Sequence, residues 1–326
     1  DYSVPLHVGA LFVLLIASAL GCAIPHAANV IYKMRGRKEL RFILKHFGSG
    51  ILLSTAFIHL LFHSFVWFSN SCVGELKYEA ASAAIAMAAV YVCFLLDFIA
   101  LRSVRQRVMQ ARQTLLARSG PQGGAGTGSE DDEKLGHREE ALSRDDASEQ
   151  LDREEFRLNK WSIVSLEAGI VFHSIIIGVT LGASSGEGWV PLLIAITFHQ
   201  FCEALGLASR IAFVLERAHA EVSHRMLKIV LHSVFILSTS FGIAIGIGVR
   251  KSFNGNDRDT LLTIGVLDSV SAGILLYSSL TQILPKDWLE SREMLTCGWG
   301  RIAAGLGSFT AGLFIMVSLR GAWRET

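Results

Sequence analysis

The sequence predicts an all-α integral membrane protein with eight transmembrane helices. Of its 326 residues, 51% are hydrophobic and only 18% are charged, whereas a soluble domain carries about 25% charged residues. The mean hydropathy is +0.42. Eight apolar runs are each long enough to cross a hydrocarbon core of about 30 Å as a helix, and in lipid a helix satisfies its own backbone hydrogen bonds.

The first three runs cover residues 8–32, 46–68 and 79–101. The first two contain no Asp, Glu, Lys or Arg, and the third contains only two acids. Charged side chains are unfavourable at the centre of a spanning helix. Each of these runs is therefore predicted to span the membrane.

The fourth and fifth runs, 161–183 and 189–209, each contain one acidic residue and are separated by a very short turn. They are expected to form an antiparallel hairpin. The last three runs, 227–249, 260–284 and 298–320, complete a 3+2+3 layout, which is typical of inverted repeats in membrane proteins. Small residues spaced by four allow close helix contact, and they occur as Gly178 with Gly182 and as Gly242 with Gly246.

The distribution of Lys and Arg favours an orientation with both termini outside the cell. The loops that this orientation places inside hold 24 of the 30 Lys and Arg residues, and such loops are normally the basic ones. Residues 102–160 include the Gly-rich, acidic stretch "GPQGGAGTGSEDDEK", which buries too little apolar surface to fold. We predict a disordered cytoplasmic loop there, between residues 1–101 and 161–326 of one membrane domain.

Polar side chains lie deep within the hairpin. His199 is ten residues into the fifth run, about 15 Å, and His173 is twelve residues into the fourth, about 18 Å. His199 and Glu203 are four residues apart and share one helix face. Two imidazoles and a carboxylate suit Zn²⁺ or Fe²⁺. Gln200 and Ser174 are further candidate ligands, or hydrogen-bond partners of the ligands.

A structural explanation competes with this metal site. One polar residue in a membrane helix often only bonds to a neighbouring helix. Three ionisable groups converging on one hairpin are harder to explain in that way, because each is costly to bury in lipid. The net charge of +1 gives no reason to expect nucleic acid as a partner; the expected surroundings are the lipid bilayer.

These motifs also carry a family resemblance. "EAGIVFHSIIIGVTLG" (Glu167 to Gly182) and "WVPLLIAITFHQFCEALGL" (Trp189 to Leu207) resemble the paired metal-site helices of the Zrt/Irt-like (ZIP) metal transporters. "GSGILLSTAFIHLL" (Gly48 to Leu61) and "GVLDSVSAGILLY" (Gly265 to Tyr277) resemble the second and seventh helices of that family. The overall pattern is most similar to fungal plasma-membrane zinc transporters.

The resemblance implies a multi-pass plasma-membrane transporter that imports divalent metal into the cytosol, with zinc first and iron second. It implies transported Zn²⁺ rather than a permanent cofactor, no enzymatic activity, and a homodimer as one option. It also implies that helices 1, 4, 5 and 6 carry the metal. Ile177 stands where members with two metals have Glu, so one principal site is expected. Ala204 stands where the family usually has Gly.

Other polar residues are candidates for the ion pathway. His63 and Asp268 lie in the predicted outer halves of their helices, and His59 is four residues deeper than His63. Glu167 lies on the inner side of His173. We expect these four to line an entrance or an exit, although each could also serve only as an interhelical hydrogen-bond partner.

Two other functions remain open from the residues alone. An intramembrane hydrolase could hold a catalytic zinc with two His, one Glu and a water, but the sequence contains no HExxH motif. A metal sensor would bind the ion without moving it. Flux through vesicles would separate a transporter from both.

Overall fold

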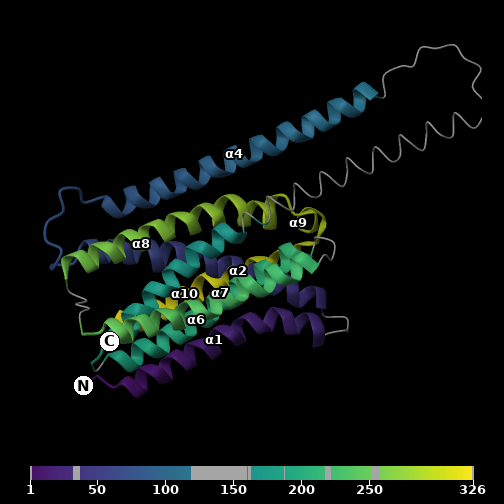
Figure 1. Cartoon of the computed structure of the whole chain (residues 1–326). Helices are drawn as coiled ribbons and strands as arrows, with labels where there is room; N and C mark the ends of the chain where they lie inside the picture. The colour runs from purple at the N-terminus through teal and green to yellow at the C-terminus, as the bar shows by residue number, and fades with distance from the viewer. Residues whose placement is uncertain are drawn as a thin grey trace, which may run out of the picture. The chain divides into compact units, whose positions relative to one another are not determined.

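The computed structural model describes residues 2–31, 37–118, 160, 163–186, 188–216, 222–251 and 257–324. All regular elements within these ranges are helical (Figure 1). In chain order they are α1 (Val4–Ile31), α2 (Arg37–Ser54), the π-helical segment η1 (Thr55–Leu61), α3 (Phe62–Phe68), α4 (Ala81–Arg118), the Ile163–Ala183 helix, α6 (Trp189–Glu216), α7 (Val222–Val249), α8 (Arg258–Tyr277), the π-helical segments η2 (Ser278–Ile283) and η3 (Pro285–Leu289), α9 (Arg292–Thr296) and α10 (Trp299–Arg324).

The prediction of eight transmembrane helices is confirmed. Among the described residues, 8 helices are long and apolar enough to cross a membrane: Val4–Pro25, Glu39–Phe68, Ala81–Ser103, Ile163–Ala183, Trp189–Ala212, Met226–Val249, Arg258–Thr296 and Trp299–Ser318. The second starts earlier than predicted and the seventh ends later, because further helical turns continue each of them. The orientation of the termini stays a prediction.

The predicted cytoplasmic loop begins as a helix. The third spanning helix, α4, continues to Arg118, so residues 102–118 are helical where a loop is expected. Leu, Ala, Arg, Gln and Met are good helix formers and dominate this stretch. The remainder of the loop, residues 119–159, lies outside the described residues. The chain divides into two compact units, Asp1–Cys93 with Ser162–Thr326, and Phe94–Trp161.

Glycine pairs bring the Ile163–Ala183 helix and α7 together, as their spacing predicts. A Cβ atom added to Gly178 would lie 2.3 Å from the Thr239 carbonyl oxygen, and one added to Gly242 would lie 2.4 Å from that of Ile175. The two backbones are therefore in direct contact. This leaves no room for a side chain at either glycine.

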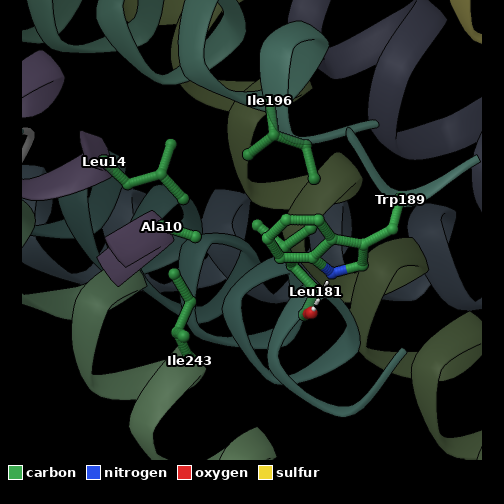
Figure 2. Packing of buried hydrophobic residues seen from close by; sticks show 6 residues of the cluster. All are labelled: Ala10, Leu14, Leu181, Trp189, Ile196 and Ile243. Carbon is green, nitrogen blue, oxygen red and sulfur yellow. Dashed lines mark hydrogen bonds between the residues drawn. The ribbon is translucent and has the colours of Figure 1, made fainter. Parts of the chain in front are cut away.

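An apolar cluster joins four helices of the larger unit at one end (Figure 2). Trp189 of α6 lies at its centre, and its indole Nε1 donates a hydrogen bond to the Leu181 carbonyl oxygen at 3.0 Å. The other members are Ala10, Leu14, Ile196 and Ile243. They come from α1, the Ile163–Ala183 helix, α6 and α7, which are the helices that the family resemblance assigns to metal carriage.

Small residues also fit α6 against its neighbours α1 and α2. Gly206 meets Gly48 of α2, where an added Cβ would lie 3.2 Å from the Gly48 carbonyl oxygen. A Cβ on Gly21 of α1 would lie 2.6 Å from the Ala204 Cβ. The Ala204 methyl group, at a position that is usually Gly in the family, is therefore accommodated by Gly21.

Candidate metal centre

Three imidazoles meet in the interior of the larger unit. They belong to His59 of η1, His173 of the Ile163–Ala183 helix and His199 of α6, and their potential ligand atoms all lie within 4.8 Å of one another. The ring centroids are 4.2 Å apart for His59 and His199, and 4.9 Å for His59 and His173. None of the three side chains is more than 5% exposed.

The spacing is compatible with one tetrahedral metal ion. Nitrogen ligands about 2.0–2.1 Å from zinc lie about 3.3 Å from one another. The three imidazoles would have to close by no more than about 1.5 Å from their present separation to meet that geometry. Side-chain torsions alone supply movements of this size.

A carboxylate completes the set of candidate ligands. Glu203 Oε1 lies 3.1 Å from His199 Nε2, one helical turn away on the same face of α6, and both groups are buried. The structure thus brings together His173, His199 and Glu203, which the sequence selects. The negative charge matters because a divalent ion in an apolar interior needs compensating charge.

Unsatisfied polar atoms surround this set. The Oγ of Ser174 and both side-chain polar atoms of Gln200 are fully buried and have no hydrogen-bond partner among the described residues. Buried polar groups are normally hydrogen-bonded, since leaving them unpaired costs free energy. Ser174 and Gln200 directly follow His173 and His199 in the sequence, which is compatible with contact to an ion or to its remaining waters.

Asp268 lies behind one of the imidazoles. His173 Nδ1 donates a hydrogen bond to Asp268 Oδ1 at 3.2 Å, and Trp67 Nε1 donates to Asp268 Oδ2 at 3.2 Å. The bond fixes the ring and leaves His173 Nε2 buried with no hydrogen-bond partner among the described residues, as a metal ligand would be. The sequence predicts only a place for Asp268 along the ion pathway. Asp268 and Glu203 are thus two buried carboxylates that contact the imidazoles of the cluster.

The two histidines of the second span have different surroundings. His59 is buried within η1 and belongs to the imidazole cluster, although its spacing predicts only a pathway role. His63 is partly exposed, and its ring centroid lies 4.9 Å from that of His59 and 6.2 Å from that of Trp67. Adjacent imidazoles therefore lead from the partly exposed His63 to His59, whose ring lies next to those of both His173 and His199.

Glu167 stands apart from the cluster. It precedes His173 by six residues, about 9 Å along the helix axis. The side chain is 3% exposed, and neither carboxylate oxygen has a hydrogen-bond partner among the described residues. Within the described part of the chain, no hydrogen bond therefore explains the burial of Glu167.

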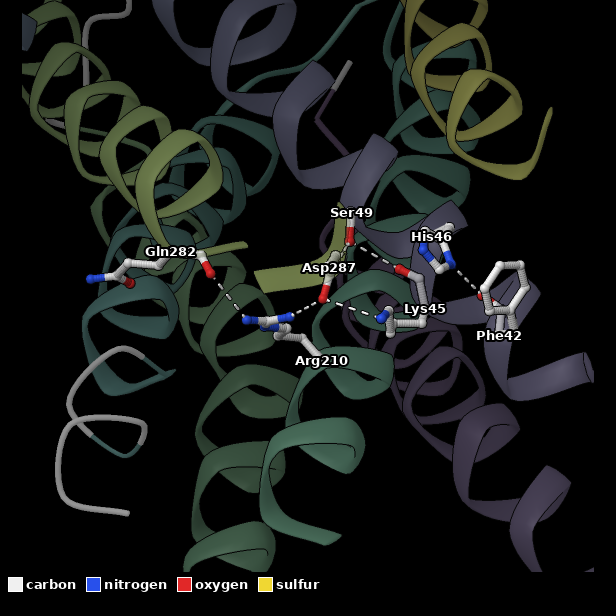
Figure 3. A network of polar contacts seen from close by, with 7 residues as sticks. All are labelled: Phe42, Lys45, His46, Ser49, Arg210, Gln282 and Asp287. Atoms are coloured by element: carbon white, nitrogen blue, oxygen red, sulfur yellow. Dashed lines mark hydrogen bonds and ion pairs between the residues drawn. The ribbon is translucent and has the colours of Figure 1, made fainter. Parts of the chain in front are cut away.

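A second polar network, which sequence reasoning missed, joins α2, α6 and η3 (Figure 3). Asp287 of η3 is fully buried and accepts from Arg210 Nη1 at 2.9 Å and from Ser49 Oγ at 2.8 Å, and Lys45 Nζ lies 3.4 Å from the same carboxylate. Arg210 Nη2 also donates to the Gln282 carbonyl oxygen at 3.5 Å. Lys45 and Arg210 lie at the predicted ends of their spans, where basic side chains are ordinary, so the sequence carried little signal of this network.

Comparisons with known proteins identify the family. The ZIP zinc transporter family model matches residues 4–320. Zinc-regulated transporter 1 of Candida albicans is 37% identical over 99% of this chain and 62% of its own length. Zinc transporter 9 of Oryza sativa subsp. japonica is 33% identical over 98% of this chain and 89% of its own length.

A third relative carries a different metal in its name. Fe(2+) transport protein 1 of Arabidopsis thaliana is 31% identical over 88% of this chain and 77% of its own length. The chain spans under two thirds of the Candida albicans relative, but the family match runs from the first helix to the last. The chain belongs to the ZIP zinc transporter family.

Proposed function

We propose that this protein is a secondary transporter that imports divalent metal into the cytosol. Zinc is the leading candidate substrate, and iron is the alternative. The observation that carries the proposal is the buried set of His59, His173, His199 and Glu203. Names of relatives, which include zinc and Fe²⁺ transporters, support both metals. Imidazole nitrogen is a ligand that suits both ions.

The proposed path runs along the adjacent imidazoles, from His63 to His59 and then to the central cluster. With both termini outside, the ion meets the partly exposed His63, passes to His59 and exchanges water for the ligands at the central site. Ser174 and Gln200 offer their side-chain oxygen atoms as the hydration shell is lost. The ion then leaves past Glu167 toward the cytosol.

The ligand set favours reversible binding. Imidazoles and one carboxylate hold zinc less tightly than a cage of four thiolates, which suits an ion that must be released. The charge of a 2+ ion would be balanced by Glu203 and by Asp268 behind His173. An ion bound without such compensation would be unstable in the membrane interior. A hydrolase fits less well, because His59 together with His173, His199 and Glu203 would bring the protein ligands to four, whereas catalytic zinc sites keep one position for water.

Zinc uptake into proteoliposomes tests the proposal. Native protein should move zinc, and His199→Ala and Glu203→Ala should lose most of this flux while retaining the fold. His232→Ala is the matched control, since His232 bonds to the Lys228 carbonyl oxygen of its own helix at 2.6 Å. Flux in the two site variants equal to native would refute the central site. Zinc binding by the native protein without flux would favour a sensor.

A further inference from the structure

A tryptophan side chain is linked to the candidate ligand His173 through one buried carboxylate. Asp268 of α8 accepts a hydrogen bond from His173 Nδ1 on Oδ1 and another from Trp67 Nε1 on Oδ2, both at 3.2 Å. Asp268 is 2% exposed. A carboxylate inside a membrane protein is costly unless hydrogen bonds compensate its burial, so both donors stabilise Asp268 where it lies.

The packing of α3 against α8 brings Trp67 to this carboxylate. Phe68, the residue after Trp67, lies against Gly265 of α8: a Cβ atom added to Gly265 would be 3.2 Å from Phe68 Cε2. Gly265 and Asp268 are three residues apart and therefore neighbours on the helix surface. The close approach at Gly265 thus places the indole of Trp67 within hydrogen-bonding distance of Asp268.

The chemistry of indole limits what Trp67 can do at this position. Its nitrogen is a donor and never an acceptor, so it cannot bind a cation as an imidazole does. Two donors on different oxygens fix the rotation of the Asp268 carboxylate, and this carboxylate in turn fixes the His173 ring. The Trp67 ring also lies beside that of the partly exposed His63, with 6.2 Å between the ring centroids. Trp67 therefore contacts both a pathway histidine and the partner of a candidate ligand.

We propose that Trp67 is a positioning residue of the metal centre: its N–H holds Asp268 in the orientation that keeps the His173 imidazole in place for the ion. The proposal rests on the proposed central site, since the orientation of His173 matters only if His173 binds the metal. The competing explanation is that the N–H bond only satisfies a partly buried indole, as is usual for tryptophan. The two explanations differ in whether Trp67 acts on zinc binding through Asp268.

A double-mutant cycle, measured by zinc calorimetry on the purified full chain in detergent, tests this difference. Trp67→Phe keeps an apolar ring and removes the N–H, and should weaken zinc binding about tenfold. Asp268→Ala should weaken it at least as much. In the Asp268→Ala background, Trp67→Phe should have no further effect, because the acceptor through which it acts is gone. Trp288→Phe is the matched control and should bind zinc like the native protein, since Trp288 Nε1 has no hydrogen-bond partner among the described residues.

Zinc uptake into proteoliposomes supplies a second readout. If Trp67→Phe only weakens binding, the zinc concentration for half-maximal uptake should rise while the maximal rate stays close to native. A variant that was merely misfolded would lose maximal rate at an unchanged half-maximal concentration, and that result would contradict the positioning role.

The outcomes separate the role of Trp67 from the proposed centre. Native zinc affinity in Trp67→Phe, losses that simply add in the double variant, or an equal loss in Trp288→Phe would each overturn the positioning role, while loss of binding in His199→Ala would leave the centre standing. Zinc binding that survives both His199→Ala and His173→Ala would overturn the centre and the positioning role with it.

Discussion

Replacing Asp287 with Asn should destabilise the fold more than removing either cation that Asp287 binds. One buried carboxylate lies within 2.9 Å of Arg210 and 3.4 Å of Lys45 (Figure 3). The network thus contains two positive charges and one negative charge. In Asp287→Asn, both cations remain buried with no carboxylate between them, and they repel each other.

The magnitude comes from this imbalance. Removing one partner of a buried pair and leaving an uncompensated charge costs about 3–5 kcal/mol, and Asp287→Asn leaves two. Arg210→Met leaves Lys45 and Asp287 as a balanced pair, so its cost should be close to that of a hydrogen bond to a charged group, about 1.5–3 kcal/mol. Ser49→Ala removes one hydrogen bond and no cation, and should cost the least.

Equilibrium unfolding in mixed detergent micelles, measured by tryptophan fluorescence, gives the free energies of unfolding. The double variant Arg210→Met with Asp287→Asn closes a thermodynamic cycle. Since only one buried cation remains in it, the double variant should be less destabilised than the sum of the single variants. Equal losses for Asp287→Asn and Arg210→Met, or strict additivity in the cycle, would refute the charge-imbalance reasoning.

Three further predictions concern helix contact and the metal centre. Gly178→Ala should cost about 1–3 kcal/mol in an unfolding experiment, because its Cβ would strike the Thr239 carbonyl; Gly248→Ala, which has open space, should be nearly neutral. Asp268→Asn should weaken zinc binding, measured by calorimetry, about 10–100-fold by loosening the His173 ring; unchanged affinity would deny it that role. His59→Ala should weaken zinc binding at the centre in the same measurement, because one of four candidate ligands is lost, whereas His63→Ala should slow uptake but keep binding; unchanged affinity in His59→Ala would exclude that residue from the ligand set.

Much of the fold was predictable because hydrophobic length alone selects a spanning helix. Apolar runs without charge determined the number and order of the helices, and the short turn before Trp189 identified the hairpin. The continuation of α4 to Arg118 was not predicted, since high polarity argues for a loop. Helix propensity does not depend on burial, and a basic helix needs no apolar face to form.

Part of the centre was predictable for a local reason. His199 and Glu203 are one turn apart, and a hairpin brings His173 near them. The hydrogen bond between His173 and Asp268 joins residues 95 positions apart. Residue spacing predicts contacts only within one helix or across a short turn, so it could not predict this bond. Lys45 and Arg210 lie at the predicted ends of their spans, where long basic side chains normally extend to water. Their burial depends on Asp287, which a different helix supplies.

His59 shows most directly why the ligand set could not be completed from spacing. In a regular helix, the face presented by each residue can be read from its number. η1 is a π-helical segment (Thr55–Leu61), and one extra residue in a turn rotates all later residues of the helix by about 100° relative to a regular α-helix. Such π-turns recur at functional sites, because they aim a side chain that regular geometry would place elsewhere. In this chain, the side chain so placed is His59, which joins His173 and His199 in the buried cluster.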